Sequence, residues 1–72
     1  MKIQARAAFI TTRIHKGLSS TGLAEAMKVS TSVVHGIEHG RNVRPATAKK
    51  ACEALNEPFE ALFIIKEDEE NE

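Results

Sequence analysis

Two short segments with the same type of start, separated by only two residues, constrain the fold of this chain most strongly. Each opens on a serine that follows an apolar residue: Leu18 precedes Ser19, and Val29 precedes Ser30. Serine is favoured at the N-cap of a helix, and an apolar residue just before the cap packs against the fourth residue of that helix. Only Lys28 and Val29 remain to form the corner. The sequence therefore predicts two short helices that meet at a tight turn.

Apolar periodicity predicts three further helices around this pair. Before the pair, apolar residues recur at intervals of three and four and indicate a first helix over residues 2–16, ended by Gly17: Ile3, Ala7, Ile10 and Ile14. After the pair, two apolar faces follow prolines that favour the opening of a helix: Ala48, Ala51, Cys52 and Leu55 after Pro45, and Phe59, Leu62 and Phe63 after Pro58. Asn56 is suited to end the first of these two helices in the left-handed region. The expected fold is all-α, a compact five-helix domain.

Length and composition indicate one soluble domain inside the cell. The chain has 72 residues, which are enough for one core and too few for two. Its only cysteine, Cys52, excludes an intrachain disulfide, and cytoplasmic localisation is the default expectation. The apolar residues near the N-terminus are interrupted by charges, so we expect neither a signal peptide nor a membrane-spanning segment.

The charge is divided unevenly along the chain. The formal net charge is zero, but half of the acidic residues lie in residues 67–72, which are predicted to form a disordered acidic tail. Residues 1–66, the predicted folded domain, carry ten Lys and Arg against five Glu, a formal charge of +5. This balance suits a partner that carries phosphates.

The spacing of apolar residues in and around the helix pair is typical of a known family. Residues 37–41 read Ile-Glu-His-Gly-Arg, and the apolar positions of the twenty-residue pair are Leu23, Ala24, Met27, Val29, Val34 and Ile37. With Arg13 ahead of the pair, this pattern resembles the phage repressor and Cro-like (Xre) family of helix-turn-helix proteins. The resemblance implies a bacterial or phage-encoded, repressor-like DNA-binding domain. It also implies an ion pair between Arg13 and Glu38, for which the arginine fork is well suited.

The family binds operator DNA as dimers, with the third helix in the major groove. By register, the resemblance assigns contacts with the phosphate backbone to Ser20, His39, Arg41 and Arg44. It assigns the base edges to Thr31, Ser32, His35 and Gly36, with Val33 close to a thymine methyl. It places the homodimer contact at the end of the fifth helix, on Phe63, Ile64 and Ile65. The alternative is that these three residues simply complete the core.

The third helix departs from the family in the residues that would meet DNA. No Arg, Lys, Asn or Gln lies between Thr31 and His39, and Lys28 replaces the usual glycine of the turn, where it would need a positive φ. One interpretation is a DNA-binding regulator that combines sparse base contacts with recognition of DNA shape. The alternative is an antirepressor or modulator of repression of the phage type, which binds a partner repressor protein through the smooth surface around Val33 and Gly36.

Other chemistry finds little support in the sequence. His35 and His39 are spaced like a zinc-binding pair, but no third ligand stands at a suitable spacing, so we expect no metal site. Cys52 lies among apolar residues and is expected to be an inert thiol. With no persuasive acid and base pair and no phosphate-binding loop, we expect neither a cofactor nor enzymatic activity.

Overall fold

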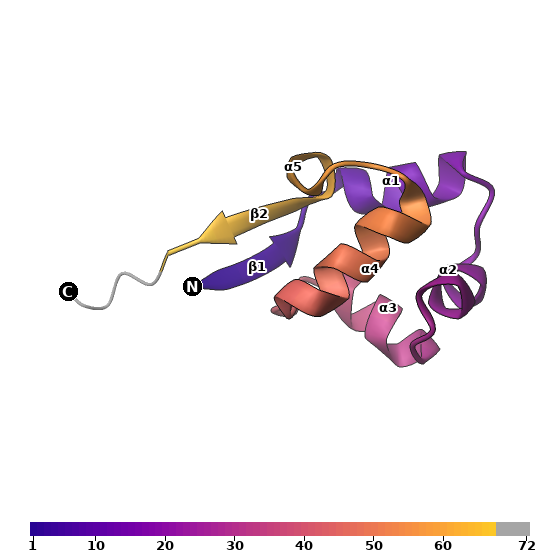
Figure 1. Cartoon of the computed structure of the whole chain (residues 1–72), viewed down its shortest axis with the longest axis horizontal. Coiled ribbons are helices and arrows are strands. Elements are labelled where there is room, and N and C mark those ends of the chain that lie inside the picture. The colour runs from indigo at the N-terminus through magenta and orange to yellow at the C-terminus, as the bar shows by residue number, and fades with distance from the viewer. Residues whose placement is uncertain (68–72) are drawn as a thin grey trace.

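The computed structural model describes residues 1–67, and the predicted tail therefore lies, apart from Glu67, outside the described residues. These residues form five helices, as predicted, together with two short strands (Figure 1). In chain order the elements are β1 (Lys2–Ala5), α1 (Ala8–His15), α2 (Ser20–Met27), α3 (Thr31–Glu38), α4 (Pro45–Leu55), α5 (Phe59–Leu62) and β2 (Phe63–Lys66). The expectation of an all-α fold is approximately right, since the fold is mostly helical, but two strands form a small sheet that was not predicted.

The N-terminal segment is a strand and a helix, where the sequence predicted one helix over residues 2–16. β1 pairs antiparallel with β2, with Ile3 opposite Ile65, and Ile3 is buried. The strand partner satisfies the backbone groups that a local helix would otherwise satisfy. Because α1 begins only at Ala8, the predicted apolar face is displaced: Phe9 is fully buried, whereas Ile10 and Ile14 are exposed.

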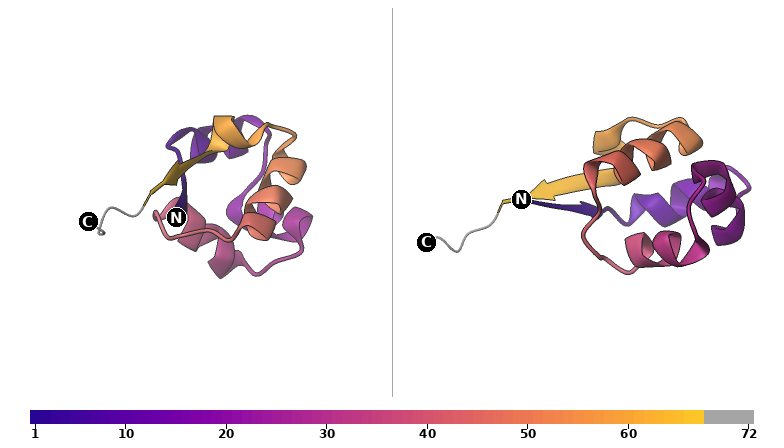
Figure 2. Two further views of the ribbon diagram at one scale, coloured as in Figure 1. Left: turned by 60° about the vertical axis from the view of Figure 1, so that its left-hand side comes forward. Right: turned by 60° about the horizontal axis from the view of Figure 1, so that its bottom comes forward.

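The C-terminal end was also predicted as helix and is partly strand. α5 ends at Leu62, and Phe63 begins β2 with a buried side chain. The ring of Phe63 packs against Phe9 and Phe59, with centroid distances of 5.7 and 5.4 Å. The strands thus close the core and extend from the helices as a ribbon (Figures 1 and 2).

Four helices end in the same way, on a residue in the left-handed region. These residues are Gly17, Lys28, Gly40 and Asn56, with φ of 77°, 62°, 86° and 55°. In each case the next residue donates its N–H to a carbonyl five positions back, as in the Schellman motif: Leu18 to Arg13, Val29 to Ala24, Arg41 to Gly36 and Glu57 to Cys52. The positive φ expected for Lys28 is confirmed, and these tight ends permit the short connections between helices.

The serine caps of the helix pair differ from each other. Ser19 Oγ accepts a hydrogen bond from the Gly22 N–H at 2.9 Å, as predicted. Ser30 occupies the N-cap position of α3, but its hydroxyl bonds Ser32 Oγ at 3.0 Å and makes no bond to a helix N–H.

The core beneath the pair contains Leu23 and Val34, both fully buried. Within residues 1–67, every helix is too short or too polar to cross a membrane.

Candidate nucleic-acid interface

The helix α3 has one buried and one solvent-facing side. Val34 and Ile37 point into the core, whereas Ser32, Val33 and His35 are exposed. Thr31 and Gly36, also predicted to face bases, are partly exposed. The five residues predicted to meet base edges therefore all reach the surface of α3. Their side chains are short or absent except for the imidazole of His35.

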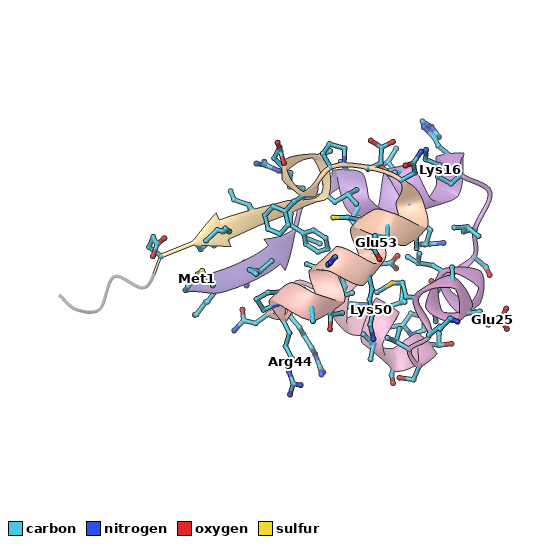
Figure 3. The ribbon with its side chains drawn as sticks, in the orientation of Figure 1. Met1, Lys16, Glu25, Arg44, Lys50 and Glu53 are labelled. Atoms are coloured by element: carbon cyan, nitrogen blue, oxygen red, sulfur yellow. The ribbon has the colours of Figure 1, made fainter. Side chains whose placement is uncertain are left out.

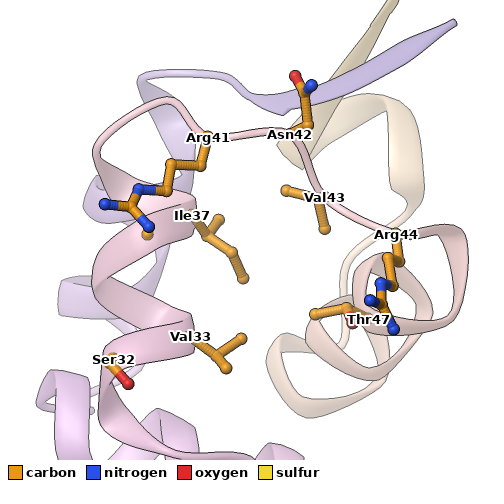
Figure 4. Close-up of a pocket in the computed structure, with 9 residues that line it drawn as sticks. Ser32, Val33, Ile37, Arg41, Asn42, Val43, Arg44 and Thr47 are labelled. Atoms are coloured by element: carbon orange, nitrogen blue, oxygen red, sulfur yellow. The ribbon is translucent and has the colours of Figure 1, made fainter.

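A hollow separates α3 from the start of α4 (Figure 4). It brings together five of the predicted DNA-binding residues: Ser32, Val33, Gly36, Arg41 and Arg44. Asn42 and Thr47 line the hollow as well and were missed in the sequence. Asn42 lies between the two predicted arginines in the sequence, and this position could have identified it as a residue of the same surface.

The loop that carries the two arginines is fixed by β1. The Val43 N–H donates to the Ile3 carbonyl at 2.8 Å. Gln4 Nε2 donates to the Gly40 carbonyl at 3.1 Å and to Asn42 Oδ1 at 3.4 Å. The strand therefore positions the loop beside α3. The sequence, which predicts a helix over residues 2–16, gives no indication of this role.

The ion pair expected between α1 and α3 is present. Arg13 Nε donates to Glu38 Oε2 at 2.6 Å, and Arg13 Nη1 donates to the Leu18 carbonyl at 2.9 Å. The guanidinium thus divides its donors between a carboxylate and a backbone oxygen and does not form a two-bond fork with Glu38. Glu38 is the only acidic residue between Glu25 and Glu53. Because Glu38 is paired with Arg13, no acidic side chain in this stretch offsets the positive charge of Arg41 and Arg44 in the following loop.

The residues predicted to meet phosphates are spread around this surface. Arg41 and Arg44 are exposed, and neither guanidinium has a hydrogen-bond or ion-pair partner within residues 1–67. Arg44 points outward from the start of α4 (Figure 3). Ser20 is the first residue of α2 and is half-buried.

His39 Nδ1 lies 2.6 Å from the His35 carbonyl oxygen, to which it donates. The part of the chain described by the structure contains no cluster of three potential metal ligands.

The residues predicted for the dimer contact are only partly available to a partner. Phe63 is 1% exposed and belongs to the core of the monomer, so its side chain is not available to a partner. Ile64 and Ile65 are exposed, by 37% and 47%. Successive strand residues point to opposite faces, and Ile65 borders an almost wholly apolar hollow that also includes Ile3 and Phe59.

Burial also affects the only thiol. Cys52 is half-buried and also borders this apolar hollow. Burial, and then the negative charges of Glu60 and Glu53, raise the pKa of the Cys52 thiol above its ordinary value. A raised pKa disfavours the nucleophilic thiolate, in agreement with an inert cysteine.

Comparison with known proteins defines the class. A family model described as Helix-turn-helix matches residues 11–62, most of the chain. The chain therefore belongs to the phage repressor and Cro-like (Xre) helix-turn-helix family, and it is a DNA-binding transcription regulator.

A solved structure with this fold extends the match. The chain is similar to the restriction-modification controller protein C.AhdI from Aeromonas hydrophila, with 32% sequence identity and a TM-score of 0.72. The similarity covers 76% of this chain and 85% of that chain. No curated protein matches the chain.

Proposed function

We propose that this regulator binds an operator as a homodimer, each protomer placing α3 in the major groove. The observation that carries the proposal is the joint placement of the exposed face of α3 and two unpaired arginines around one hollow. A helix fits the major groove of B-DNA, and cations beside it meet the phosphates along the groove edges. Similarity to a restriction-modification controller supports a regulator of transcription.

The side chains of α3 allow a small number of direct contacts with bases. The hydroxyls of Thr31 and Ser32 and the imidazole of His35 can donate or accept hydrogen bonds. Val33 is 37% exposed and offers an apolar contact to a thymine methyl. With so few long polar side chains on the helix, DNA shape and bridging waters supply part of the specificity.

Salt dependence tests the placement of the phosphate-binding side. The protein would be titrated against DNA selected from a random library, at several salt concentrations. Arg44→Ala is expected to weaken binding to every sequence and to reduce the slope of log affinity against log salt by about one per protomer, that is, by about two for the dimer. Lys50→Ala is the matched control, because Lys50 lines a different hollow with Met27 and Glu53 and its loss should leave the slope unchanged.

Two outcomes would contradict the proposed function in different ways. Equal slopes for the parent and Arg44→Ala would remove Arg44 from the DNA contact. If the parent bound no DNA sequence but bound a second regulator tightly, the protein would act as an antirepressor, and the proposal of an operator-binding protein would be wrong.

The apolar hollow beside Ile65 is the surface we propose for the dimer. Ile65→Asp places a charge at its border, whereas Ile64→Asp places the same charge on the opposite face of β2. We expect Ile65→Asp to lower the dimer fraction in sedimentation velocity, with Ile64→Asp close to the parent. Equal dimer fractions for Ile65→Asp and the parent would move the interface elsewhere.

A further inference from the structure

Gly36 and Arg41 are brought together by the way in which α3 ends. Gly40 takes a φ of 86°, and the chain turns back so that the Arg41 N–H donates to the Gly36 carbonyl at 3.0 Å. In a Schellman motif, these two positions usually hold side chains that touch each other. Here one of them is a glycine, so the other side chain can lie directly on the helix backbone.

The stem of Arg41 occupies the space that a side chain at position 36 would take. A Cβ built on Gly36 would lie 3.3 Å from Arg41 Cδ and 4.0 Å from Arg41 Cγ. Figure 4 shows Arg41 lying back across the end of α3, while Arg44 stands on the opposite side of the hollow. The two arginines are therefore held in different surroundings, although both belong to the same loop.

The position of Gly36 brings the stem of Arg41 to the predicted base-reading face of α3. Ser32 and Gly36 are four residues apart, so they are neighbours on one side of α3. The arginine stem that lies on Gly36 is therefore about one helical turn from Ser32 along α3. The Arg41 guanidinium has no partner within residues 1–67, and α3 itself has no long side chain that could form two hydrogen bonds to a base.

We infer that Arg41 is a base-reading residue, which supplies from the loop the bidentate contact that α3 lacks. This inference rests on the proposed function and changes the role that the resemblance assigned to Arg41, a contact with the phosphate backbone. The chemistry identifies the target as a guanine in the major groove, whose O6 and N7 accept two parallel N–H bonds from one guanidinium. Gly36 is then a positioning residue, whose missing side chain admits the Arg41 stem.

The test compares base preference with overall affinity. Binding would be measured for the selected operator and for all single-base changes in one half-site. Arg41→Ala is expected to reduce the preference for guanine at one position by about 5- to 150-fold, as is typical of a bidentate contact. Arg41→Lys keeps the charge and can still donate to guanine O6 or N7 but lacks the planar fork, so it should retain affinity for non-specific DNA and a reduced preference for guanine.

Two further variants separate positioning from charge. Gly36→Ala puts a methyl group against the Arg41 stem and should lower the same preference, although alanine favours the helix. In the Arg41→Ala background, the alanine at position 36 should have no further effect on that base pair. Arg44→Ala should weaken all sequences alike, as expected for a phosphate contact.

The outcomes distinguish a failure of this inference from a failure of the proposed function. If Arg41→Ala weakened every sequence equally, Arg41 would be a phosphate contact and the inference would be wrong. If the parent bound no DNA sequence at all, the proposed function would fail, and the inference would fail with it.

Discussion

The ion pair that joins α1 to α3 allows a quantitative prediction about stability. Arg13 makes two hydrogen bonds, to Glu38 and to the Leu18 carbonyl, and both side chains of the pair are largely buried, with exposures of 13% and 9%. A hydrogen bond to a charged group contributes about 1.5–3 kcal/mol net. Removal of one partner also leaves the other unsatisfied in a partly buried place.

The two single variants should therefore differ in cost. Arg13→Met removes both bonds and is expected to lower the free energy of unfolding by about 3–4 kcal/mol. Glu38→Gln keeps an acceptor oxygen and the bond to Leu18, so we expect a loss of only about 1–2 kcal/mol. In the double variant the second change should add little, which corresponds to a coupling energy of about 1–2 kcal/mol.

Urea unfolding followed by circular dichroism measures all three variants, since the linear dependence on urea gives each free energy. The matched control is the cycle on Lys16 and Glu57, which are 3.4 Å apart and 39% and 34% exposed. A surface pair of this kind should couple by less than about 0.5 kcal/mol. If the Arg13 and Glu38 cycle gave no more than this control, the reasoning from burial and geometry would be refuted.

Two other predictions concern local features. Lys28→Gly should stabilise the protein by about 0.5–1 kcal/mol, because glycine relieves the left-handed strain of about 1–2 kcal/mol and loses part of that gain through unfolded-state entropy. Asn56→Gly is the control. It should change the urea midpoint less, since asparagine tolerates the left-handed conformation. A lower urea midpoint for Lys28→Gly than for the parent would contradict the prediction. Since the pKa of Cys52 is raised, iodoacetamide at pH 8 should alkylate the folded protein more slowly than the urea-unfolded protein, and Glu60→Gln should speed the reaction. Equal rates in the folded and unfolded states would show that the thiol is not shielded.

The helix pair was predictable because its signals are local. Ser19 as a cap, the left-handed Lys28 and the glycine that ends α3 each depend on a few neighbouring residues. The Arg13 and Glu38 pair was predictable only through family resemblance. The hollow between α3 and α4 could be anticipated in part, because Arg41 and Arg44 follow the motif directly.

The strands were not predictable by the same means. The spacing from Ile3 to Ala7 fits a helix turn, and the preference for a strand comes from a partner at the far end of the chain. A single helix over residues 2–16 directs Ile10 and Ile14 into the core and leaves Phe9 off its apolar face. The contact of Arg41 with Gly36 likewise depends on the left-handed turn at Gly40. No local sequence pattern predicts where that turn places the Arg41 side chain.

The ribbon of β1 and β2 has a consequence for the order in which the molecule assembles. Lys2 pairs with Lys66, so the ribbon closes a loop that contains nearly the whole chain. Contacts between distant residues form late, because the entropy of closing the loop must be overcome first, whereas α2 and α3 contact each other through a short turn. During synthesis, the helix pair can therefore fold before Ile65 has joined Ile3 at the border of the apolar hollow. The element that we propose to meet DNA therefore forms ahead of the surface that we propose for the dimer, which is completed only when β2 pairs with β1.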